Sequence, residues 1–112
     1  MSRRLERVAE ILQQQLSHIL NKDLSEKYGL ITVACVVVSS DIKEAKVFIS
    51  LLDKKQENKL IKEIEDTRNH IQIEIASRIQ LRRTPRLVFK IDKIQDRITK
   101  VEKLLEEIES ES

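Results

Sequence analysis

The spacing of the apolar residues switches between a helical period and a strand period along the chain, and this order restricts the fold more than any other feature. Three segments repeat apolar residues every three or four positions, as amphipathic helices do: 3–20, 53–84 and 94–108. Three other segments are β-branched or alternate apolar with polar residues, as strands do: 30–38, 45–52 and 86–91. The order predicts an α+β fold with a three-stranded sheet.

The first two strands are expected to form a hairpin. The run 30–38 follows the only glycine, Gly29, and is apolar on both faces. This is typical of a central strand, so we place it in the middle of the sheet. Cys35 in this run is expected to behave as a small core residue. Residues 39–44 are polar and favour a turn, and the alternation in 45–52 predicts one buried face.

The long helical segment is expected to begin at a capping box, Asp53 with Gln56 three residues later, and to end before Pro85. Its apolar phase runs through about 30 residues, which would make a rod about 45 Å long. A domain of this size has a radius of gyration of only about 13 Å. We therefore expect a kink at two poor helix formers, Thr67 and Asn69, where Asn69 can cap the next turn.

The chain of 112 residues is expected to form a single domain over residues 1–112, with a core in 3–108 and a polar acidic tail in 109–112. The longest apolar run is nine residues, whereas a membrane-spanning helix needs about 20, so no span is expected. One cysteine cannot form an internal disulfide, which favours the cytoplasm. One cysteine and two histidines cannot supply the four ligands of a structural zinc site, and no metal or other cofactor is expected.

The formal net charge of +2 hides a strongly basic segment. Residues 78–103 contain nine lysines and arginines against three acidic residues, whereas the last nine residues contain four glutamates and no basic residue. A local basic field attracts a polyanion within a Debye length of about 8 Å. The three aromatic residues are few for a module that stacks bases on rings.

Ten side chains are candidate RNA contacts. Those around Pro85 have no acidic residue between 75 and 91 to pair with locally, and the guanidinium fork suits phosphate. Those at the N-terminus and at the expected kink are equally compatible with a solvated surface or plain helix capping. The lysines in 54–62 alternate with acidic residues and are expected to form a solvated face. The ten candidates are Arg3, Arg4, Arg7, Arg68, Asn69, Arg78, Arg82, Arg83, Arg86 and Lys90.

The order of elements resembles that of KH domains of the second type, in which helices pack on one face of a three-stranded sheet. Three stretches are similar to the ribosome-binding factor A family: RLERVA at 4–9, VVVSSDIKEAKVFIS at 36–50 and IQLRRTPRLVF at 79–89. They occur in the order and at the spacing of that family, and the resemblance covers about residues 3–108. Like that family, the chain lacks the GxxG loop of ordinary KH domains, since it has a single glycine.

The resemblance implies a non-enzymatic assembly factor for the small ribosomal subunit. It implies binding to the free, immature 30S subunit and its 16S rRNA, including the 5′-terminal helix, and help with late maturation and precursor rRNA processing, especially at low temperature. Where the family has an Ala-x-Gly junction between two helices, this chain has Thr67-Arg68-Asn69. Asn69 tolerates a left-handed backbone better than most residues, so a kink is still expected.

The alternative is a protein-interaction module that pairs through the last helix, where apolar residues stand at 94, 98, 101, 105 and 108. Two heptads are short for a coiled coil, so we expect this helix to fold back on the domain and the protein to be a monomer. No glycine-rich phosphate loop, metal-ligand spacing or nucleophile with a base is visible in the sequence, and an enzyme is not expected.

Overall fold

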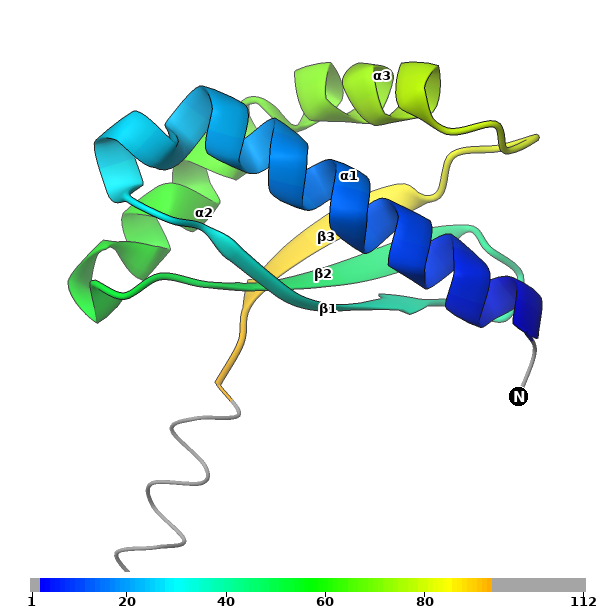
Figure 1. Ribbon diagram of the computed structural model, residues 1–112, viewed down its shortest axis with the longest axis horizontal. Coiled ribbons are helices and arrows are strands. Elements are labelled where there is room, and N and C mark those ends of the chain that lie inside the picture. The colour runs from blue at the N-terminus through cyan, green and yellow to red at the C-terminus, as the bar shows by residue number, and fades with distance from the viewer. Residues whose placement is uncertain (1–2, 94–112) are drawn as a thin grey trace, which may run out of the picture.

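The computed structural model describes residues 3–93 and has three helices on one face of a three-stranded sheet (Figure 1). The elements are α1 (Arg3–Tyr28), β1 (Thr32–Val38), β2 (Glu44–Ser50), a short 3-10 helix (Lys54–Gln56), α2 (Glu57–Asp66), α3 (Arg68–Arg78) and β3 (Arg86–Ile91). The expected α+β class and KH-like order are confirmed over these residues. The helix expected at 94–108 and the tail at 109–112 lie outside the described residues.

Helix α1 is eight residues longer than the apolar spacing in 3–20 predicts. Its buried stripe continues past Leu20 through the half-buried Leu24 to the buried Tyr28. The polar residues between them conceal this stripe in the sequence, because they face solvent or bond to the next segment. Asn21 bonds through its side-chain amide to both backbone groups of Ile31, each at 2.8 Å. The helix ends at Gly29, whose φ of 75° is unfavourable for residues with a side chain.

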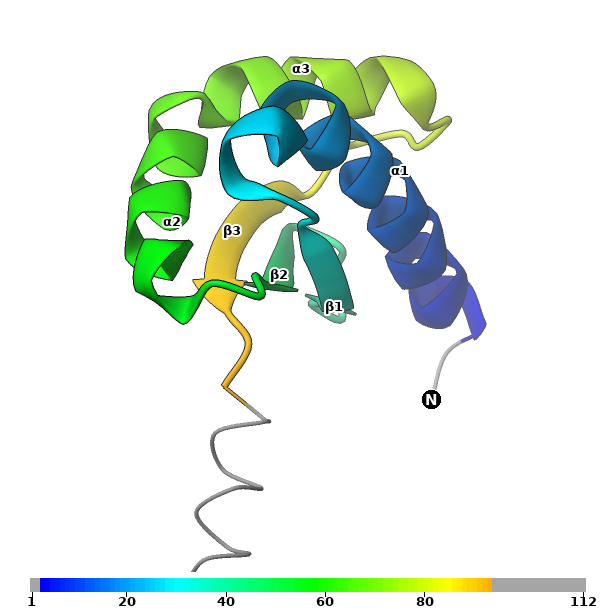
Figure 2. The same ribbon diagram turned by 60° about the vertical axis from the view of Figure 1, so that its left-hand side comes forward.

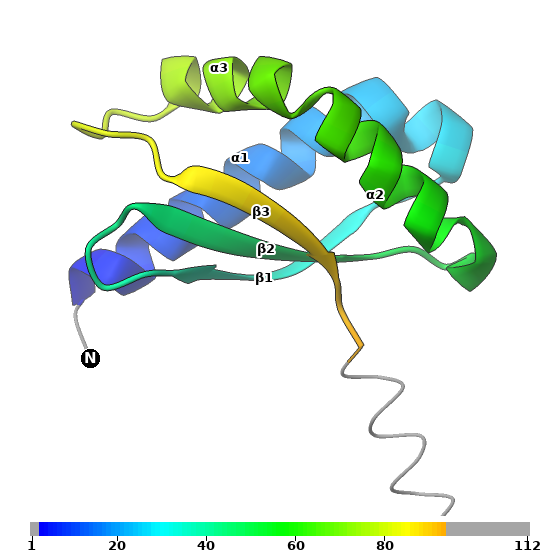
Figure 3. The same ribbon diagram turned by 180° about the vertical axis from the view of Figure 1, so that it is seen from behind.

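The expected central position of β1 is wrong, because the strand order is β1-β2-β3 and β2 lies in the middle. Strand β2 pairs antiparallel with β1 and parallel with β3 (Figure 3). Only Val33 and Val36 of β1 are buried, and Val37 is 55% exposed. The run of β-branched residues therefore marks an edge strand packed under α1. Gln13 of that helix donates from its side-chain amide to the carbonyl oxygen of Val33 at 2.9 Å.

A β-bulge in β1 explains why the period-2 pattern fails there. The register with β2 shifts between Val33 and Cys35, so the two inward residues Val33 and Val36 are three positions apart instead of two. Cys35 lies in register with Phe48 on the opposite face and is half-buried, so its expected place in the core is wrong. Burial, followed by the charge of Asp92, raises the pKa of the Cys35 thiol above its ordinary value.

The core lies between the inner face of the sheet and the helices (Figure 2). The expected alternation in β2 is confirmed, since its inward residues Ala45, Val47 and Ile49 are fully buried. Leu87 and Phe89 of β3 continue this face, as the alternation after Pro85 predicts. Hydrophobic burial of this kind supplies roughly 1.5–3 kcal/mol per large side chain and holds the helices on the sheet.

The expected kink is confirmed at Thr67, which separates α2 from α3 and has φ −108° and ψ 11°. Its hydroxyl donates to the carbonyl oxygen of Glu63 at 3.0 Å and so satisfies one of the last carbonyls of α2. The expectation that Asn69 caps α3 is wrong. Asn69 lies inside the first turn of α3, and its φ is not positive. The expected capping box differs in one bond. The side chain of Gln56 donates to the side-chain carboxylate of Asp53 at 3.3 Å instead of bonding to the backbone N–H of Asp53.

Two carboxylates tie α1 to the other helices. Glu63 of α2 accepts hydrogen bonds from the hydroxyl of Tyr28 and from Lys27, which together lower the pKa of its carboxyl group. Glu74 of α3 accepts from Lys22 at 2.7 Å, and this contact lowers the pKa of Glu74 in the same way. Both pKa values therefore lie below the ordinary value of 4.5 in the folded protein.

The lowered pKa values of Glu63 and Glu74 predict how the stability of the fold changes in acid. A carboxyl group whose pKa is lower in the folded than in the unfolded chain contributes stability above its unfolded pKa and loses it as pH falls through its folded pKa. We expect the double variant Glu63→Gln and Glu74→Gln to melt slightly below the parent at neutral pH. The difference should vanish in acid, when melting temperatures are compared across pH. A constant difference would show that the charges of Glu63 and Glu74 play no part.

Candidate nucleic-acid interface

A tight turn joins β1 to β2 and presents one end of the candidate site. The hydroxyl of Ser39 donates to the Asp41 carboxylate at 2.7 Å and accepts from the backbone N–H of Glu44 at 3.0 Å. Ile42 adopts a φ of 58°, and its N–H donates to the carbonyl of Ser39 at 2.9 Å. The bonds from Ser39 and from the N–H of Lys43 lower the pKa of Asp41, so this carboxylate is ionised at neutral pH.

The loop from α3 to β3 is fixed at both of its ends. Leu81 packs against the core, and Pro85 is fully buried. The side-chain amide of Gln72 in α3 donates to the carbonyl oxygen of Pro85 at 2.7 Å and accepts from the N–H of Leu87 at 3.2 Å. Beside it, the N–H of Arg86 donates to the carbonyl of Lys43 at 2.8 Å. The loop is therefore held against the hairpin turn.

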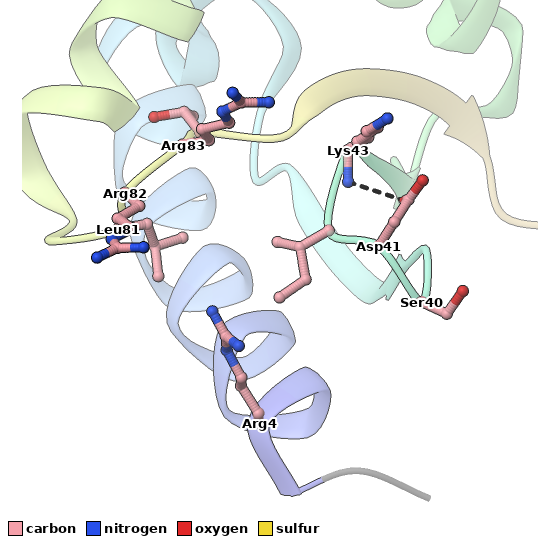
Figure 4. A pocket seen from close by; sticks show the side chains of 9 residues that line it. Arg4, Ser40, Asp41, Lys43, Leu81, Arg82 and Arg83 are labelled. Carbon is pink, nitrogen blue, oxygen red and sulfur yellow. Dashed lines mark hydrogen bonds between the residues drawn. The ribbon is translucent and has the colours of Figure 1, made fainter.

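These segments and the first turn of α1 surround an open hollow of about 740 Å³ (Figure 4). Arg4 reaches it from α1, Arg82 and Arg83 from the loop, and Lys43 from the turn. The lining also includes Ser40, Asp41, Ile42, Leu81 and Thr84. We call this site the basic hollow. Four cationic side chains from three parts of the chain thus line the hollow together with a single carboxylate, which leaves a local excess of positive charge.

The four cationic side chains of the basic hollow are exposed and have no partner among the described residues. Within residues 3–93, none of the side chains of Arg4, Lys43, Arg82 and Arg83 makes a hydrogen bond or an ion pair. Elsewhere in this part of the chain, Lys22 and Lys27 are paired with glutamates. Free guanidinium groups can donate two parallel hydrogen bonds to a phosphate, so the hollow is chemically suited to a polyanion.

Two predicted basic contacts, Arg78 and Arg68, are engaged within the protein. Arg78 donates to Glu74 at 2.9 Å, and Arg68 lies 3.6 Å from Glu65. Asn69 is exposed beside Arg68 on the first turn of α3. The plainer interpretation of an ion-paired helix surface fits Arg68 and Arg78 better than it fits the loop arginines.

The remaining candidates lie on two other surfaces. Arg3 and Arg7 are exposed on the first turns of α1, on the helix that carries Arg4. Arg86 and Lys90 are exposed on β3, at positions that alternate with the buried Leu87 and Phe89. They therefore face away from the helices. Arg86 is next to Pro85 in the chain but is not part of the lining of the basic hollow.

Lys43 was missed by reasoning from the sequence, although a signal for it existed. Strands β2 and β3 are joined by two helices and run parallel, so both begin at the same end of the sheet. The residue before β2 must then lie beside the loop before β3. A parallel pairing of these strands, assumed in advance, would have placed Lys43 next to Arg82 and Arg83.

A search of the described residues finds no group of side chains with the composition of a metal site. Nor does any helix in residues 3–93 have the length and apolar character needed to cross a membrane.

Comparison with known protein families finds a match over most of the chain. The family model described as ribosome-binding factor A matches residues 4–105. The chain belongs to the ribosome-binding factor A family. The ribosome-binding factor A of Prochlorococcus marinus is 36% identical over 114 residues, covering 98% of this chain and 93% of that protein. The factor of Brevibacillus brevis is 36% identical over 110 residues, covering 96% of this chain and 91% of that protein.

Solved structures of the ribosome-binding factor A family share the fold. The crystal structure of the factor from Thermus thermophilus has a TM-score of 0.69 at 21% identity, covering 78% of this chain and 94% of that chain. A homology model of the Thermus thermophilus factor, fitted into a cryo-EM map of a 30S complex with ribosome-binding factor A, has a TM-score of 0.58 at 23% identity. It covers 73% of this chain and 92% of that chain. At these identities the likeness concerns the fold alone.

Proposed function

We propose that this protein binds the small ribosomal subunit during its assembly and contacts 16S rRNA through the basic hollow. Membership of the ribosome-binding factor A family supports the partner, as does the 30S complex of the Thermus thermophilus factor. The observation that carries the site is the meeting of Arg4, Lys43, Arg82 and Arg83 without partners among residues 3–93. Cations that are free of ion pairs are available to release counterions from an RNA backbone.

The geometry favours recognition of a folded backbone over readout of single bases. The cations come from a helix, a turn and a loop that are held together by buried or hydrogen-bonded anchors. Such a fixed arrangement favours a particular spacing of phosphates, because the backbone segments that carry the cations need little reordering on binding. Asp41 adds a constraint, since its ionised carboxylate repels any phosphate that approaches the turn too closely.

The finer role follows from the family resemblance. We propose a non-enzymatic factor that acts on the free, immature 30S subunit near the 5′-terminal helix of its rRNA and assists late maturation and precursor processing. A greater need at low temperature has a physical reason, because misfolded RNA helices melt more slowly in the cold. We also propose that the protein acts in the cytoplasm as a monomer without a cofactor.

Sedimentation with purified ribosomal particles tests the proposal. The protein is expected to sediment with immature 30S particles, less with mature 30S particles and not with 50S particles. Binding should weaken as the salt concentration rises, because phosphate contacts release counterions. Equal sedimentation with both subunits would reduce the interaction to non-specific attraction, and absence of sedimentation with either would overturn the proposed partner.

A further inference from the structure

The face of the sheet turned away from the helices has no described element on it (Figures 1 and 3). The alternation of buried residues in β2 and β3 assigns Phe48 and Val88 to this outer face. The register after the bulge places Cys35 opposite Phe48 and Val37 opposite Lys46, so both residues of β1 lie there too. We call this surface the outer sheet face.

The outer sheet face mixes apolar and basic side chains, with Lys46 of the central strand in register between Val37 and Val88. Cys35, Phe48 and Val88 are only half-buried, and Val37 is 55% exposed. The charged residues on the same face are Lys46, Arg86 and Lys90 against Glu44, judged by strand alternation and register, and Asp92 adds a second acidic group just after β3. An amphipathic partner that also carries acidic groups would fit this mixed surface.

The chain itself continues from the edge of this face. β3 ends at Ile91, and the N–H of Asp92 still donates to the carbonyl of Ile49 at 2.8 Å. Asp92 is close enough to Cys35 for its charge to raise the pKa of that thiol. The chain therefore leaves the sheet beside the outer face, and residues 92–93 are enough for a strand-to-helix connection, which takes about 2–6 residues.

The segment 94–108 has the spacing, length and charge of a partner for this face. Its apolar residues stand at 94, 98, 101, 105 and 108, the period of one helical face. Fifteen helical residues span about 22 Å, which matches the roughly 23 Å of a seven-residue strand. Within 94–108 there are four acidic and three basic side chains, and two further glutamates follow at 109 and 111, whereas the outer sheet face has a small excess of positive charge.

We propose that residues 94–108 form an amphipathic helix that docks across the outer sheet face of the same molecule. Its apolar stripe covers Phe48, Cys35 and Val37. Docking covers Lys46 and brings acidic side chains of the segment close to this face, which weakens the attraction of the face for RNA, so that the basic hollow stays the principal polyanion site. The docking does not depend on the RNA-binding role.

Cys35 is the only cysteine and lies on the proposed interface, so it is a built-in probe. We expect slow modification of Cys35 by dithiobis(nitrobenzoate) in the full chain. The variant Val101→Asp, which places a charge in the apolar stripe, should raise the modification rate at least tenfold. Thr99→Asp adds the same charge on the polar side of the stripe and serves as the matched control, with a rate close to that of the parent.

Three results would overturn the proposal. Equal rates of Cys35 modification in the parent and both variants would show that nothing covers the outer sheet face. A rate in the parent that falls as protein concentration rises would identify a second copy as the occupant. Protection that appears only on adding an rRNA fragment would identify RNA. Thermal melting by circular dichroism checks that the variants are folded. As a second measurement, at least one of the variants Ile98→Cys, Val101→Cys and Leu105→Cys should form an intramolecular disulfide with Cys35 on oxidation, whereas Thr99→Cys should not.

Discussion

Replacing Val47 with Asp is expected to remove most or all of the stability of the fold. Val47 is fully buried in the central strand and lies between Val36 of β1 and Phe89 of β3, both of which are also buried. An uncompensated carboxylate there costs several kcal/mol, and the lost burial of the valine adds about 1.5–3 kcal/mol. Domains of this size are stable by only about 5–15 kcal/mol, so the variant should be largely unfolded at 37 °C.

The matched control for Val47→Asp is Thr32→Asp. Thr32 starts the edge strand β1 and is exposed, so its carboxylate remains in water. We expect a cost of no more than about 1 kcal/mol, mainly from the poorer strand propensity of Asp. Urea unfolding followed by circular dichroism measures both variants. Similar midpoints for the two variants would contradict the assignment of β2 as the central strand and of its inner face as the core.

Replacing Arg4, Arg82 and Arg83 together with Ala is expected to weaken binding to small-subunit rRNA on the order of 100-fold at about 0.1 M salt. Each neutralised phosphate contributes roughly 0.7–0.9 to the slope of log K against log salt. The triple variant should therefore flatten this slope by roughly 1 to 3 units. Its melting temperature should stay nearly unchanged, because these side chains have no ion-pair partner within residues 3–93.

A variant that loses the same charge on another surface distinguishes binding through the basic hollow from non-specific attraction of RNA by the net charge of the protein. Lys55, Lys59 and Lys62 are exposed on or next to α2, where acidic residues alternate with them. Their triple replacement by Ala should leave the salt slope close to that of the parent. An equal flattening in both triple variants would mean that net charge alone governs binding, and an unchanged slope in the arginine variant would remove the hollow from the interface.

The parts of the fold that the sequence predicts are those set by local patterns. The alternation of Val47 and Ile49 with polar residues predicts β2 because strand geometry alone decides it. The kink at Thr67 is predictable since a continuous rod would overhang the core. The long extension of α1 to Tyr28 was missed because polar residues with tertiary partners, such as Asn21, interrupt its apolar pattern.

The features that sequence reasoning missed depend on contacts between distant segments. The edge position of β1 follows from the parallel pairing of β3 with β2, which no local pattern in β1 records. The bulge that turns Cys35 outward is likewise a property of the strand pair. In the candidate site, the density of basic residues points to Arg82 and Arg83, but the contribution of Lys43 appears only when the hairpin turn is placed beside the loop.

Directed hydroxyl-radical probing on immature 30S particles tests most directly whether the basic hollow faces rRNA. With Cys35 replaced by Ser, an iron chelate is attached at Ser40→Cys in the lining of the hollow, and in a second variant at Lys59→Cys on α2. Probing from position 40 is expected to cleave 16S rRNA at a few discrete sites, and probing from position 59 is expected to give weak or no cleavage. Strong cleavage from position 59 with none from position 40 would contradict the proposed interface.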